Sequence, residues 1–124
     1  MEFKIDTRPS YTLIIPVSTV LNANLTGNIR QKWEETGQSG SLNLIVDLQN
    51  CIIAEDTALN AMQQMHEDFY SGEHSLVFTG LKEELLQKLK MNNSEMFINI
   101  APTMAEAIDI ISMEILERDL FNEE

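Results

Sequence analysis

Residues 42–48, with the sequence LNLIVDL, restrict the fold of this chain more than any other stretch. Leucine, isoleucine and valine fill this stretch, and only Asn43 and Asp47 are polar. A strand with one solvated face alternates apolar and polar residues, whereas a strand that is covered on both faces is apolar almost throughout. The stretch therefore predicts a parallel strand that is covered by helices.

Two strands and a helix are predicted before it. Residues 2–7 alternate polar and apolar side chains, as in a half-buried edge strand, and residues 8–10 turn the chain into a second, antiparallel strand at 11–17. From Asn22 the apolar residues recur every four positions. This spacing predicts a helix of about three turns that is capped by Asn22, ends at 37–40 and buries Leu25, Ile29 and Trp33.

Helices and strands are predicted to alternate after residue 48. A helix from about Asp56 would bury Leu59, Met62, Met65 or His66, and Phe69. A strand at 75–78, a short helix marked by Leu81, Leu85 and Leu89, and a last strand at 96–100 come next. Thr103 and Glu106 form a capping box that opens a final helix through about Phe121.

This order of elements predicts an α/β protein with one mixed, mostly parallel sheet of about five strands and about four helices. At 124 residues the chain is expected to form a single domain over 1–124. Its core would span about 3–116, and 117–124 would form an acidic end of the last helix.

The charge of the chain narrows the choice of partners. Its formal net charge is -12, with only 8 lysines and arginines. Nucleic acids and anionic lipids attract basic patches, so the sequence predicts neither partner and favours basic or mixed protein surfaces instead. The amino terminus does not read as a signal peptide, and no apolar run approaches the length of a membrane span. These features predict a cytoplasmic protein without direct membrane insertion.

The segment after the central strand is the candidate contact site. It runs from Asn50 through Ile52 to Glu55, Asp56, Thr57 and Ala58, where the second predicted helix starts. Free backbone N–H groups and the positive end of the helix dipole meet at a helix start, which suits a negative charge or a phosphate. Aspartate is also among the best N-cap residues, so a purely structural role for Asp56 stays open beside the functional one.

Three segments together resemble the STAS domains, the family that includes bacterial anti-sigma factor antagonists. The stretch Glu55-Asp56-Thr57-Ala58-Leu59 stands where the family has a motif of the type Asp-Ser-Ser/Thr-Gly-Leu after an apolar strand. The segment 19–22 stands where members often carry Gly-Glu-Leu-Asp, and 97–100 followed by 104–108 resembles the last strand and helix start. The resemblance covers about 3–116.

The resemblance implies a non-enzymatic module that regulates transcription by partner switching with an anti-sigma factor or a related serine kinase. In the family, phosphorylation of a serine at the helix start releases the partner, and Asp56 occupies that position here. Thr57 could be a displaced acceptor, Asp56 could hold a state that resembles the phosphorylated one, or the domain could be a docking subunit of a membrane transport complex. The second and third alternatives are favoured, because the hydroxyl of Thr57 would point about 100° away.

Other functions have less support in the sequence. Asp47 follows an apolar strand, as the phosphoacceptor of a response-regulator receiver domain does, but the acidic pair and the lysine of such a site are missing. His66 and His74 have no ligand partner at a zinc-binding spacing, and Cys51 lies in an apolar run that predicts a buried residue. We therefore expect no catalytic, metal or cofactor site.

The final helix has a second apolar stripe in addition to its predicted core face of Met104, Ile108, Ile111 and Ile115. This outer stripe consists of Ile110, Met113, Leu120 and Phe121, interleaved with acidic residues. One interpretation is a second interface, with another subunit in a homo-oligomer or with a basic partner. The alternative is that the last turn folds back and buries Leu120 and Phe121 locally.

Overall fold

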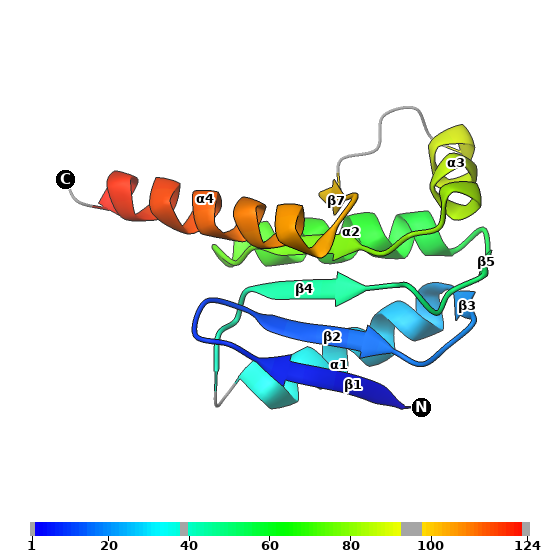
Figure 1. Cartoon of the computed structure of the whole chain (residues 1–124), viewed down its shortest axis with the longest axis horizontal. Coiled ribbons are helices and arrows are strands. Elements are labelled where there is room, and N and C mark those ends of the chain that lie inside the picture. The colour runs from blue at the N-terminus through cyan, green and yellow to red at the C-terminus, as the bar shows by residue number, and fades with distance from the viewer. Residues whose placement is uncertain (1, 38–39, 93–97, 123–124) are drawn as a thin grey trace.

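The computed structural model describes residues 2–37, 40–92 and 98–122, and over these ranges it shows a five-stranded sheet with four helices (Figure 1). The sheet has the order β1-β2-β4-β6-β7, in which β1 is antiparallel to β2 and the other neighbours are parallel. Its strands are β1 (Phe3–Thr7), β2 (Thr12–Pro16), β4 (Leu44–Asp47), β6 (Leu76–Thr79) and β7 (Ile100–Ala101). The predicted fold class is confirmed.

Alternation along the central strands divides the core into two layers. Leu44 and Val46 of β4 point into one apolar cluster, and Ile45 between them points into a second cluster on the other face. In β6, Phe78 lies in the first cluster and Val77 in the second. All of these side chains are buried. The sheet is therefore covered on both faces, as residues 42–48 predicted.

Three helices contribute to the first cluster, namely α1 (Ala23–Gly37), α2 (Ala58–Ser71) and α3 (Glu83–Asn92). Between α1 and α2, the rings of Trp33 and Phe69 pack with centroids 4.3 Å apart. Met62 and Met65 are buried as predicted, and His66 is half-buried. The remaining helix, α4 (Met104–Asn122), covers the other face through Ala107 and Ile111. Within the described ranges, no helix has the length and apolar character that a bilayer crossing needs.

Two features differ from the predicted elements. A two-stranded parallel sheet, β3 (Val20–Leu21) with β5 (Ile53–Ala54), lies at the carboxyl end of the main sheet. Strands of two residues are too short to leave a periodic pattern, so neither was predicted from the sequence. The predicted strand 96–100 is shorter and displaced, since β7 contains only Ile100 and Ala101, and residues 93–97 lie outside the described ranges.

Gly80 controls how closely β6 approaches the end of β4. Its φ of +76° lies in the left-handed region, and a Cβ placed there would lie 2.1 Å from the Asp47 Oδ1 atom and 3.1 Å from the Gln49 backbone nitrogen. Only glycine meets both the dihedral and the spatial requirement at this point. The conformation of the turn after β6 therefore requires glycine at position 80. Because this turn packs against Asp47 and Gln49, it also fixes where the loop after β4 begins.

We predict that Gly80→Ala lowers the free energy of unfolding by more than about 1 kcal/mol, because the new Cβ meets strain and the Asp47 carboxylate together. Gly27→Ala is the matched control, since nothing lies within 4 Å of a Cβ at this position inside α1. This change should raise stability by about 0.5–1 kcal/mol. Urea denaturation of both variants checks the pair, and equal effects would contradict the role of Gly80.

Candidate functional site

The segment 48–57 leaves the carboxyl end of β4 and runs beside residues 19–21. The backbone N–H groups of Ile52 and Ile53 donate to the Thr19 carbonyl at 2.7 and 3.0 Å, and the Glu55 N–H donates to the Leu21 carbonyl at 2.9 Å. Leu48, at the start of the segment, donates to the Thr79 carbonyl at 2.8 Å. These backbone bonds fix the segment at both ends.

Two lysines from the region of α3 hold the same segment from the other side. The Lys82 ammonium donates to the Gln49 carbonyl and, at 3.3 Å, to the Cys51 carbonyl. The Lys88 ammonium donates to the Ala54 carbonyl. Charge-assisted bonds of this kind are stronger than bonds between neutral groups. Figure 1 shows α3 beside β5, the position from which these lysines reach the loop.

Three apolar side chains are exposed at this end of the sheet. Ile52 is 58% exposed, Ile53 55% and Val17 45%. The Asn50 side-chain amide donates to the Pro16 carbonyl at 3.2 Å, which ties the end of β2 to the loop. We call Val17, Ile52 and Ile53 the apolar patch. Ile52 and Ile53 are followed in the chain by the exposed acidic residues Glu55 and Asp56.

The start of α2 differs from the prediction. The helix begins at Ala58, not near Asp56, and Thr57 is its N-cap residue without a side-chain cap bond. The Ala58 N–H bonds to the Glu55 carbonyl at 3.0 Å, which makes 55–58 a turn ahead of the helix. Asp56 lies in this turn with an exposed side chain. The interpretation of Asp56 as the N-cap is therefore wrong, because the turn moves the cap by one residue, to Thr57.

Thr57 connects the starts of the two helices α1 and α2. Its hydroxyl oxygen accepts a 3.1 Å bond from the Ala23 N–H, the first residue of α1. The predicted cap of α1 is confirmed, since the Asn22 Oδ1 atom accepts from the Leu25 N–H at 2.9 Å. The same Asn22 side chain donates to the Glu55 Oε1 atom at 3.0 Å. The Thr57 hydroxyl thus faces the start of α1.

Most of the predicted contact residues reach the surface. Glu55, Asp56, Thr57, Asn50 and Ile52 are exposed at one end of the sheet. Ala58 is the exception: it is fully buried under the core, so its side chain cannot contact a partner. This position faces the sheet because it opens the buried stripe of α2.

Sequence reasoning included Ile53 in the contact segment without singling it out, and it missed Val17, Lys82 and Lys88. The adjacent pair of isoleucines at 52–53 was a usable signal for the second exposed side chain. The two lysines gave no signal, because their carbonyl partners are about 30 residues away in the chain.

Comparison with known proteins finds no matching protein family and no matching curated protein. Solved structures do match: a variant of RsbS from Moorella thermoacetica has a TM-score of 0.65 and 17% identity, covering 95% of this chain and 99% of that one. The anti-sigma factor antagonist SpoIIAA in its unphosphorylated form has a TM-score of 0.62 and 13% identity, covering 90% of this chain and 96% of that one. The chain has the STAS-like fold. A murine solute carrier 26 anion transporter also matches, with a TM-score of 0.68 and 14% identity over 86% of this chain and 18% of that one.

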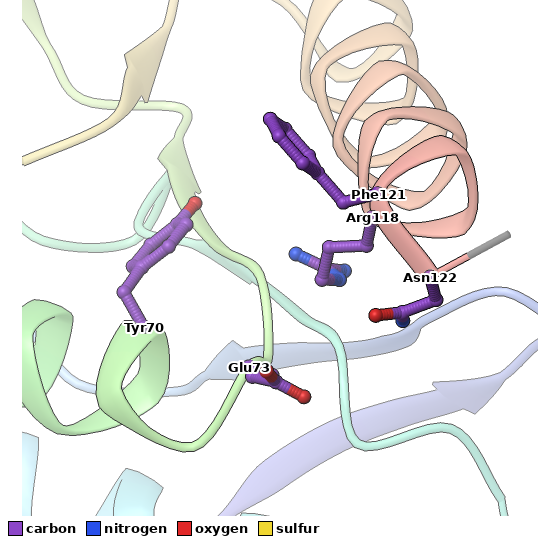
Figure 2. Close-up of a pocket in the computed structure, with 5 residues that line it drawn as sticks. All are labelled: Tyr70, Glu73, Arg118, Phe121 and Asn122. Atoms are coloured by element: carbon purple, nitrogen blue, oxygen red, sulfur yellow. The ribbon is translucent and has the colours of Figure 1, made fainter. Parts of the chain in front are cut away.

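The opposite end of the STAS-like domain carries a polar network beside a cavity of about 330 Å³. The Tyr70 hydroxyl donates to the Glu114 Oε1 atom at 2.6 Å and accepts from the Asn99 amide at 2.6 Å, and burial raises the pKa of Tyr70. Figure 2 shows Arg118 and Phe121 extending from α4 toward the end of α2. This network links α2 with α4, which makes it a structural connection far from the apolar patch.

Cys51 and Asp47 both lie near the contact segment. The Cys51 thiol is buried, and burial raises its pKa, which disfavours the reactive thiolate. Among the described residues, no group of three histidine, cysteine, aspartate or glutamate side chains is placed to hold a metal ion. The Asp47 carboxylate accepts bonds from the backbone and side chain of Gln49 at 3.1 and 3.2 Å.

The prediction of an exposed outer stripe on α4 is only partly correct. Met113 and Leu120 are each 60% exposed and Phe121 is 83% exposed, so the last turn does not fold back over its apolar residues. Ile110 instead packs against the second apolar cluster. The reason is angular: Ile110 lies about 100° from the buried Ile111 around the helix, close enough to reach the sheet side.

We predict that Lys88→Met loosens the loop. The variant removes the charge-assisted bond to the Ala54 carbonyl, and such a bond contributes on the order of 1 kcal/mol when it is partly exposed. Hydrogen exchange of the Ile52, Ile53 and Glu55 amides should therefore accelerate several-fold. Lys90→Met is the matched control, since Lys90 lies on the same helix and is exposed. Unchanged exchange in Lys88→Met would contradict the role of this lysine.

Proposed function

We propose that this chain is a non-enzymatic protein-interaction module that acts by partner switching, and that it contacts its partner through the apolar patch and the acidic turn at 55–56. One observation carries the proposal. Two neighbouring isoleucines, Ile52 and Ile53, are more than half exposed on a loop that is hydrogen-bonded on both sides. Exposed apolar side chains on a fixed backbone are typical of a contact surface, because little conformational entropy is lost when a partner binds.

The partner that suits this surface has an apolar pocket with basic residues around it. Burying a fully exposed isoleucine contributes about 1.5–3 kcal/mol. Because Ile52 and Ile53 are 58% and 55% exposed, burying the rest of both would contribute about 2–3 kcal/mol, which is part of a micromolar affinity. Glu55 would then favour a basic rim, in line with the net charge of -12, whereas the charge of Asp56 would set which of the two states the domain holds. The likeness to SpoIIAA supports an anti-sigma factor or a kinase-type regulator of bacterial transcription as this partner.

Asp56 would act as a permanent negative charge in the switch position. A phosphate adds nearly two negative charges to a side chain, and an exposed carboxylate supplies part of that charge without a kinase. The bond between the Thr57 hydroxyl and the Ala23 N–H supports this assignment, because it engages the neighbouring hydroxyl with α1. The chain would therefore stay in one of the two states between which a phosphorylated antagonist alternates.

A docking subunit of a membrane transport complex is the second candidate. The likeness to the transporter, which extends over 86% of this chain, favours it. In that role the apolar patch would bind one partner permanently, and Asp56 would serve only as a surface charge. A receiver-like domain has no support in the topology, because β1 is antiparallel to β2 and receivers have a fully parallel sheet.

Affinity capture from a lysate of the source cells tests the proposal and separates the two candidates. The baits are the wild type, Asp56→Ser, Asp56→Lys and the double variant Ile52→Ser/Ile53→Ser, and mass spectrometry identifies what is bound. We expect the double variant to lose the partner at least tenfold, and Asp56→Ser to gain a kinase-type anti-sigma factor. Capture of the same transporter proteins by the wild type and both Asp56 variants would favour docking.

Two control baits make the outcome specific. Glu34→Ser removes an exposed carboxylate from α1, and Met91→Ser removes an exposed apolar side chain from α3. Neither should change what is captured. Undiminished capture by the double isoleucine variant would show that the apolar patch is not the contact surface. Phosphate on Thr57 in the recovered protein would contradict the assignment of Asp56 as a permanent charge.

A further inference from the structure

The outward face of α4 carries a second apolar surface that the proposed function does not use. Met113, Leu116 and Leu120 are each 60% exposed, at spacings of three and four residues. At about 100° per residue, the three side chains fall on the side opposite the buried Ile111. We call these three residues the α4 stripe. Figure 1 shows α4 running along the sheet, with its carboxyl end away from α3 and β5.

The stripe has no role in holding the domain together. The second apolar cluster is filled by Ile45, Val77, Ala101, Ala107 and Ile111, with further helix and strand residues packed against it, and the α4 stripe is not among them. Three large apolar side chains in one line on an exposed helix are a pattern that marks helix-to-helix contact. The spacing i, i+3, i+7 fits the side of one amphipathic helix that lies along α4.

The charges around the α4 stripe indicate whether it binds a second copy of this chain or a different protein. Glu106, Asp109 and Glu117 are exposed on α4, and its single basic residue, Arg118, donates to Asn43 at the end of the sheet. In a two-fold contact between copies, antiparallel α4 helices centred on Leu116 would place Glu117 beside its own counterpart. Like charges at that distance repel, which disfavours the homo-oligomer on this face.

We propose that the α4 stripe is the docking site for a basic amphipathic helix of a partner protein. Leucine-type side chains of that helix would interdigitate with Met113, Leu116 and Leu120. Lysines or arginines would face Glu106 and Glu117 along one flank of the stripe and Asp109 at its amino-terminal end. This surface is on α4 and the proposed switch surface lies on the loop 50–56, so one chain could hold two partners. The inference rests on α4 alone and does not require the proposed function.

The test uses a synthetic 18-residue helical peptide with leucines on one face and lysines on its flanks as the probe. We expect chemical-shift changes in the ¹⁵N spectrum of the full chain to concentrate on residues 109–121 of α4. The double variant Met113→Ser/Leu116→Ser should weaken binding at least tenfold without a change of charge. Met91→Ser, which removes an exposed apolar side chain from α3, should leave the affinity unchanged.

A second peptide with glutamates in place of the lysines tests the charge requirement, and it should bind at least tenfold more weakly. Equal binding of the two peptides would overturn the proposal, as would shift changes confined to residues 50–56. Sedimentation of the chain alone is the remaining arm. A dimer that is lost in Met113→Ser/Leu116→Ser would show that a second copy occupies the stripe, and would also overturn the proposal.

Discussion

The position of β4 determines where every other part of this protein lies. It is hydrogen-bonded to β2 on one edge and β6 on the other, and Leu44, Ile45 and Val46 are completely buried. Because successive side chains point to opposite faces, this one strand anchors both apolar clusters. The chain therefore leaves β4 at a fixed point, and the contact loop begins there. Because both edges of β4 are hydrogen-bonded and both of its faces are buried, the loop that exposes Ile52 and Ile53 starts from a rigid strand.

The loop after β4 is held by bonds that a free loop would not have. Backbone N–H groups of the loop donate to carbonyl oxygens of residues 19–21. From the side of α3, lysine ammonium groups donate to carbonyl oxygens of the loop. Because several of its backbone groups bond within the protein, the loop can present Ile52 and Ile53 to solvent on a fixed backbone. The turn at 55–58 then places Asp56 outside the helix and directs the Thr57 hydroxyl to α1. These contacts make the loop and the two helix starts one unit.

The sequence predicted the parts of the fold that depend on periodicity. The central strand, the stripe of α2 and the cap of α1 by Asn22 could all be read from the spacing and type of residues. The start of α2 could not, because the capping preference of aspartate competes with a turn that only tertiary contacts select. Ile110 was misplaced for a similar reason, since a helix of α4's composition has apolar residues over most of its circumference. The bonds of Lys82 and Lys88 join distant parts of the chain and exist only in the folded protein.

Hydrogen exchange of the chain with and without its captured partner is the measurement that most directly tests the central claim, namely that the loop at 50–56 is the contact surface. The amides of Asn50, Glu55 and Asp56 should become protected in the complex, and those near the Tyr70 network should not change. Protection that is confined to other parts of the chain, with the loop exchanging as it does in the free protein, would contradict the claim.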